Sequence, residues 1–156
     1  MECHETGANG MQDYDPDVEY QREHVDVVNH PPHYRGKFGM EAIDVIEAQF
    51  GCAGHLPQAM GYILWHQAKG TPVTDLAKAK WYVDRMHKAD PLPAVMPRLP
   101  LDYQQRAADA FDLKGRARDA LFHLIDAATF KHEADRRMFL RNCSGALEDA
   151  IKEAGK

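Results

Sequence analysis

The prolines between residues 90 and 100 limit the fold of this chain more than any other feature of its sequence. Proline lacks a backbone N–H and holds φ near about −65°, so a stretch that contains four of them cannot be helical. We expect a stiff, extended linker over 90–100, which separates a first unit at 27–89 from a helical C-terminal extension at 101–156. The prolines are Pro91, Pro93, Pro97 and Pro100.

Apolar residues recur every three or four positions on both sides of this linker, which is typical of amphipathic helices. The pattern predicts an all-α fold, a small helical bundle of about five to six helices. The expected helices span 40–50, 57–67, 72–88, 102–112, 115–130 and 132–154. Pro57 should occupy the first position of its helix, Thr71 or Thr74 should cap the next, and the last could break near Ser144 and Gly145.

Charge is distributed unevenly along the 156 residues. Residues 1–28 carry eight acidic side chains and one basic one, while residues 29–156 have a net charge of +2. We expect a disordered acidic tail over 1–26, because dense charge with few large aliphatic residues cannot build a core. A duplex nucleic acid partner is not expected, since duplex binding requires a concentrated basic face, but a small anionic ligand fits this charge.

The composition indicates a globular protein that stays in the cytoplasm. The hydrophobic share is 44% and the charged share 28%, and no apolar run approaches the roughly 20 residues that span a membrane. The N-terminus is acidic and polar, unlike a signal peptide. The cysteines lie far apart, so we expect reduced thiols and neither disulfides nor a cysteine-rich zinc site.

The segment Val28-Asn29-His30-Pro31-Pro32-His33-Tyr34 is a candidate wall of a binding site. Its two prolines stiffen the backbone, so the neighbouring polar and aromatic side chains are presented from an extended segment. An equally acceptable interpretation is a tight lead into the next helix with ordinary loop histidines.

Acidic side chains recur every third residue along the expected helix 40–50, at Glu41, Asp44 and Glu47. A solvated helix face is the usual explanation of such a stripe. The functional alternative is that these carboxylates hold Mg²⁺ or accept hydrogen bonds from the histidine segment.

The expected helix 72–88 combines basic and aromatic residues, with Lys78, Arg85 and Lys88 beside Trp81 and Tyr82. Such a surface can hold a phosphate and stack a base. It can equally be a helix whose long basic side chains lie over a core tryptophan.

These motifs together resemble a known family. They are Val28-Asn29-His30-Pro31-x-His33-Tyr34, Glu41-x-Ile43-Asp44-x-Ile46-Glu47, Tyr62, Lys69-Gly70 and Asp75-Leu76-x-Lys78-Ala79-Lys80-Trp81-Tyr82-x-x-Arg85. Residues 27–88 resemble a family of small phage proteins, a domain of unknown function that includes a deoxynucleoside monophosphate kinase without a P-loop. The resemblance implies a phage origin and a nucleotide ligand.

The resemblance also implies roles for particular residues. Catalytic roles fall on His30, His33 and Asp44, and Glu41 and Asp44 would bind Mg²⁺, with ATP as the phosphate donor. The nucleotide would be bound by Asn29, Tyr34, Tyr62, Lys69, Lys78, Trp81 and Arg85. No Gly-x-x-x-x-Gly-Lys-Ser/Thr sequence occurs in the chain, so a Walker-type phosphate site is excluded.

The chain departs from this family in the second helix. Family members usually carry a Lys immediately before Tyr62 and a Trp-Arg pair shortly after it. Here Gly61 precedes the tyrosine, and Leu64-Trp65 is followed by His66 and Gln67. Phosphoryl transfer depends on charge neutralisation, so binding should tolerate this loss of positive charge better than turnover does.

Three functions therefore remain open from the sequence. The chain could be a Mg²⁺-dependent nucleotide kinase-like phosphotransferase, a protein that sequesters a nucleotide such as a host immune signal without converting it, or a structural, partner-binding helical protein. We also expect a homo-oligomer, because a unit of about 60 residues buries little surface alone and the apolar stripes of the C-terminal helices need partners.

Overall fold

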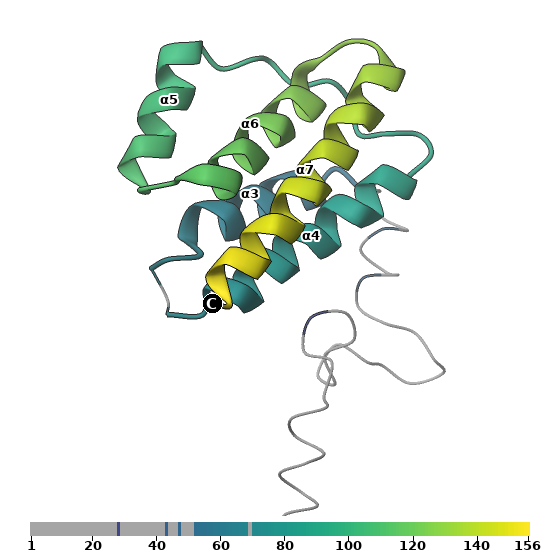
Figure 1. Ribbon diagram of the computed structural model, residues 1–156. Coiled ribbons are helices and arrows are strands. Elements are labelled where there is room, and N and C mark those ends of the chain that lie inside the picture. The colour runs from purple at the N-terminus through teal and green to yellow at the C-terminus, as the bar shows by residue number, and fades with distance from the viewer. Residues whose placement is uncertain (1–27, 29–42, 44–46, 48–51, 69) are drawn as a thin grey trace, which may run out of the picture.

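The computed structural model shows an all-α protein (Figure 1). The structure describes residues 28, 43, 47, 52–68 and 70–156. Among these residues the helices are α3 (His55–Trp65), α4 (Pro72–Lys88), α5 (Leu101–Ala110), α6 (Gly115–Thr129) and α7 (Glu133–Ala154). No strand occurs in these ranges, so the all-α prediction is confirmed for them.

The helix boundaries agree with the sequence except at a few positions. The bounds of α4 are those predicted, and Ile43 and Glu47 are helical, as expected for 40–50. The prediction for α3 was wrong by two residues, because this helix begins at His55 after Gly54 and Pro57 is its third residue. Proline is tolerated there since the first-turn N–H groups have no partner within the helix.

Two smaller expectations are corrected. Thr71 precedes α4 without a side-chain cap; its hydroxyl donates instead to the Asp75 carboxylate, at 3.5 Å. The last helix is not broken at Gly145 but runs unbroken through α7. Buried Cys143 and Leu147 lie on either side of this glycine, so packing holds both halves of the helix against one core.

One hydrophobic core joins helices from both sides of the proline-rich linker. In Figure 1, α7 lies along α6 and α4, and the helix contacts confirm these pairs together with α3 against α4 and α3 against α6. The core contains the fully buried residues Ile63, Val83, Leu124 and Leu147. The apolar stripes of α6 and α7 are thus covered within the chain and give no argument for a homo-oligomer, which stays a prediction.

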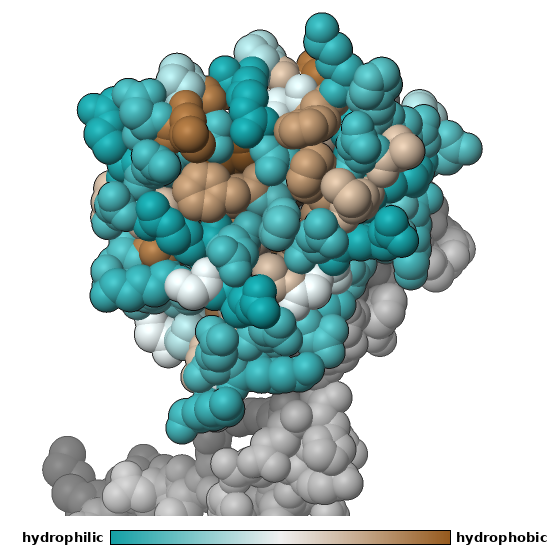
Figure 2. Space-filling model, turned by 45° about the horizontal axis from the view of Figure 1, so that its top comes forward, coloured by the Kyte–Doolittle hydropathy of each residue, from teal (hydrophilic) through white to brown (hydrophobic). Residues whose placement is uncertain are grey.

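The linker is not helical, as its prolines predict, and follows the end of the bundle from α4 to α5 (Figure 1). Its backbone is fixed on α6, because the Met96 N–H donates to the Ala128 carbonyl at 2.8 Å. Arg98 adds an ion pair with Asp126 at 2.7 Å. Apolar side chains of the linker and of α5 remain exposed, and Figure 2 shows brown side chains among hydrophilic ones on the face turned forward.

Within the described ranges, no helix is both long enough and apolar enough to cross a bilayer.

Candidate functional site

Basic and aromatic side chains gather on one side of α4. Lys78 lies three and four residues before Trp81 and Tyr82, and Arg85 lies four and three residues after them, so each cation shares a side of the helix with both rings. Tyr62 joins them from α3, because its ring stacks on that of Tyr82 with centroids 6.1 Å apart and 16° between the planes. We call these five residues the α3–α4 face.

Each cation of this face lies over an aromatic ring. The Lys78 Nζ is 5.6 Å from the centroid of the Tyr62 ring, and the Arg85 Cζ is 4.9 Å from that of Trp81. The Trp81 and Tyr82 rings meet edge to face at 5.0 Å. All five residues are half-buried, so the face is packed against the bundle and still reaches solvent.

The face continues into an ion pair with Glu47, which belongs to the helix expected at 40–50. Arg85 donates from Nε to Oε1 of Glu47 at 2.7 Å and from Nη2 to Oε2 at 2.8 Å. The imidazole of His55 lies 2.8 Å from the same Oε1 through its Nε2. His55 is buried at the start of α3, with 2% of its surface exposed. This contact joins three helical segments at one carboxylate.

The charge of Glu47 decides whether His55 donates or accepts in the hydrogen bond between them. The hydrogen bond from Arg85 lowers the pKa of Glu47 from 4.5 to about 2; burial opposes this shift and the hydrogen bond from His55 adds to it. The carboxylate is therefore ionised at neutral pH and can only accept hydrogen bonds. It follows that His55 donates from Nε2.

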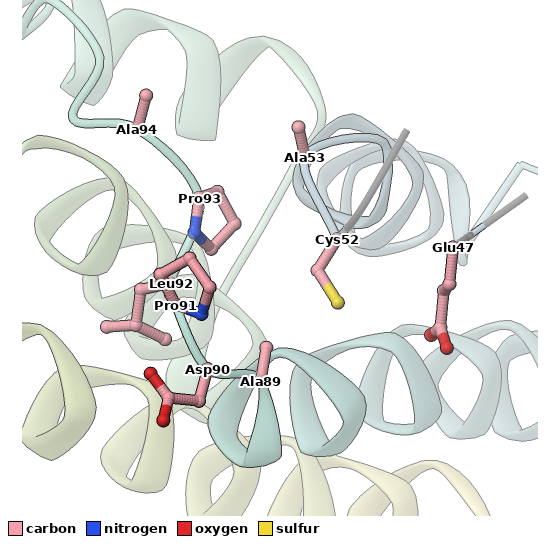
Figure 3. A pocket seen from close by; sticks show the side chains of 9 residues that line it. All are labelled: Glu47, Cys52, Ala53, Ala89, Asp90, Pro91, Leu92, Pro93 and Ala94. Atoms are coloured by element: carbon pink, nitrogen blue, oxygen red, sulfur yellow. The ribbon is translucent and has the colours of Figure 1, made fainter. Parts of the chain in front are cut away.

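A pocket of about 480 Å³ opens beside this ion pair. Its walls come from Glu47, Cys52, Ala53 and the segment 89–94, which starts the proline-rich linker (Figure 3). The Cys52 sulfur points into the space bounded by Ala53, Ala89 and Pro93 (Figure 3). Burial and the nearby charge of Glu47 raise the pKa of the Cys52 thiol. As predicted, Cys52 and Cys143 are free thiols.

The predicted site residues divide into two groups. Four of them, Tyr62, Lys78, Trp81 and Arg85, lie together on the α3–α4 face. The others lie outside the described residues: Asn29, His30, His33, Tyr34, Glu41, Asp44 and Lys69. The proposed Mg²⁺ ligands are in this second group. The roles assigned to all these residues stay predictions.

The structure also adds residues that are absent from the predicted site. Glu47 was considered only as one carboxylate of the acidic stripe, as a possible Mg²⁺ ligand or hydrogen-bond acceptor, and Cys52 only as a reduced thiol. His55 drew no attention, although Cys52-x-x-His55 places two potential ligands one turn apart. The Cys52-x-x-His55 spacing could have identified these two potential ligands, whereas no feature of the sequence indicates that Glu47 lies beside them.

No curated protein and no solved structure shows a significant match to this chain. The resemblance seen in the motifs is confirmed only in part, because its extent agrees but no link to a kinase is found. Residues 28–84 of this chain match the family described as a protein of unknown function, DUF3310.

Proposed function

We propose that this chain is a phage nucleotide-binding protein and that the α3–α4 face forms part of its nucleotide site. The observation that carries the proposal is the alternation of cations and rings, with Lys78 over Tyr62 and Arg85 over Trp81. Aromatic faces stack on nucleobases, and adjacent basic groups bind phosphates. Local chemistry of this kind suits a ligand with both a flat ring and a negative charge.

The activity that we propose for this site is a kinase-like transfer of a phosphoryl group from ATP to a deoxynucleoside monophosphate. His30, His33 and Asp44 would act at the reacting groups, while Glu41 and Asp44 would hold Mg²⁺, which neutralises phosphate charge when bound. The contact between Glu47 and Arg85 supports this, because it brings the end of the expected acidic helix to the basic face of α4.

A second function, nucleotide sequestration without turnover, is favoured by the charges that are present. Arg85 is already neutralised by both oxygens of Glu47, which weakens its capacity to compensate a transferring phosphate. At position 61, where the family usually has Lys, a Cβ atom would lie 3.0 Å from the Trp65 ring. The Trp65 ring thus lies beside this position, and α3 itself contains no Lys or Arg that could replace the missing positive charge.

Lys78→Gln should weaken nucleotide binding by about 10- to 100-fold, because a charge-assisted hydrogen bond contributes on the order of 1.5–3 kcal/mol. The measurement is a thermal-shift titration with mono-, di-, tri- and cyclic nucleotides, followed by calorimetry for each ligand that stabilises the chain. Lys88→Gln is the matched control, since it removes the same charge from the exposed end of the same helix. Equal losses in both variants, or no stabilisation of the unaltered chain by any nucleotide, would contradict the proposed site.

Asp44→Asn separates the two functions. In a kinase this change should abolish conversion of the monophosphate to the diphosphate, because it removes a carboxylate charge from the metal and the reacting groups. In a sequestering protein it should alter affinity only modestly. Chromatography of the nucleotide after incubation with ATP and Mg²⁺ reads the difference, and a nucleotide recovered unchanged from the unaltered chain rejects the kinase.

A further inference from the structure

Three side chains of different chemistry converge where α3 begins. A carboxylate oxygen of Glu47, the sulfur of Cys52 and an imidazole nitrogen of His55 all lie within 4.8 Å of one another. The local backbone fixes two of them, because the His55 N–H donates to the Cys52 carbonyl at 3.1 Å. The third arrives from another helical segment and is oriented by Arg85.

We propose that Glu47, Cys52 and His55 form a binding site for Zn²⁺, with its fourth coordination position open to the adjacent pocket. None of these three ligands was assigned to nucleotide binding, although Glu47 accepts hydrogen bonds from Arg85 of the α3–α4 face. The site also differs from the Mg²⁺ proposal in ligand chemistry, because it uses a thiolate and an imidazole beside one carboxylate.

A zinc ion would fit between the three ligand atoms after small movements of their side chains. Glu47 Oε1 and His55 Nε2 are now 2.8 Å apart and share a hydrogen. Zinc bonds of about 2.0–2.3 Å place the ligands of a tetrahedral site roughly 3.4–3.8 Å from one another. The ion would therefore take the place of that hydrogen. The oxygen and nitrogen would separate by about 0.6 Å, and the sulfur would approach them by no more than about 1 Å.

The ligand set selects the metal. Thiolate and imidazole are preferred by zinc and by related transition metals, whereas Mg²⁺ requires oxygen ligands. On binding, the Cys52 thiol releases its proton to solvent, and His55 binds through Nε2 with its proton moved to Nδ1. Arg85 can keep its bond to Glu47 Oε2, so that it orients the carboxylate from outside, as groups behind metal ligands commonly do.

The pocket supplies the remaining position. Two of the three ligands, Glu47 and Cys52, line it, and its opposite wall is the mostly apolar segment from Ala89 to Ala94 (Figure 3). Three protein ligands with a fourth position open to water or a substrate are typical of catalytic rather than structural zinc. A water molecule or an oxygen atom of a ligand in the pocket would complete the coordination.

The test is a titration of the full chain, first freed of metal by a chelator, with Co²⁺ as a visible substitute for zinc. We expect one Co²⁺ per chain, a thiolate-to-cobalt charge-transfer band, and loss of that band when Zn²⁺ is added. Cys52→Ser should remove the band and weaken binding by about 100-fold or more, because even groups behind the ligands contribute 10–100-fold. The matched controls Cys3→Ser and Cys143→Ala should keep it.

Two results would overturn the proposal: absence of the band in the unaltered chain, or its persistence in Cys52→Ser. Alkylation provides a second measurement that needs no substitution. Zn²⁺ should slow the reaction of Cys52 with iodoacetamide, located by mass spectrometry, in the unaltered protein. Cys143 is an internal reference, since none of its surface is exposed. An unchanged alkylation rate at Cys52 would also contradict the site.

Discussion

Replacing Leu147 by alanine should lower the free energy of unfolding by about 2–5 kcal/mol, the largest effect of a single substitution that we expect in this protein. Leu147 lies on α7 and is fully buried in the core shared with α3 and α4. Its loss removes apolar contacts and leaves a cavity that the surrounding helices fill only in part. Denaturant unfolding followed by circular dichroism measures this change.

Leu101→Ala is the matched control, because 61% of Leu101 is exposed at the start of α5 and the same atoms are removed. This variant should lose less than about 0.5 kcal/mol of unfolding free energy, as most surface substitutions do.

The unaltered chain should also unfold in one transition, because α4 precedes the linker in the sequence, α7 follows it, and the two helices share a core. Two separate transitions, or equal effects of both substitutions, would show that α7 is not part of the common core.

Glu47→Gln should destabilise the protein by about 2 kcal/mol at pH 7. The substitution keeps the shape of the side chain and removes the negative charge that faces half-buried Arg85 and buried His55. Glu133→Gln is a matched control, because Glu133 also accepts two hydrogen bonds from one arginine, Arg137, but its side chain is 62% exposed. The control should lose about 0.5 kcal/mol or less.

The same variant tests how stability depends on pH. The pKa of Glu47 falls from 4.5 in the unfolded chain to about 2 in the folded one, so between these values the unfolded state binds more protons. The contribution of Glu47 is therefore complete above pH 4.5 and is lost as the pH falls towards 2. The difference between the unaltered chain and Glu47→Gln should shrink over this window. A difference that stays constant down to pH 2 would mean that Glu47 is not held by Arg85 in solution.

The sequence alone determined the class of fold and most of the helix boundaries. Helical periodicity and the effect of proline on the backbone are local properties. The bounds of α4 are accordingly those predicted, and the proline-rich linker is not helical. The errors arose where tertiary packing overrides local preference. The continuation of α7 through Gly145 is such a case, because core residues on both sides hold the helix together.

Part of the candidate site could also be found in the sequence. Lys78, Trp81 and Arg85 share a helix, so their spacing already placed them on one face. The partner of Arg85 could not be found in this way, since Glu47 is 38 residues away and a helix stripe does not reveal what it packs against.

Only the tertiary structure decided that Glu47 meets Arg85 and His55, and that Cys52 stands beside them at a pocket. The physical reason is that side-chain chemistry and periodicity are set residue by residue, whereas the distance between charges on different helices is set by how those helices pack. The sequence therefore determined which groups are available, and the packing of α3 and α4 decided which of them act together.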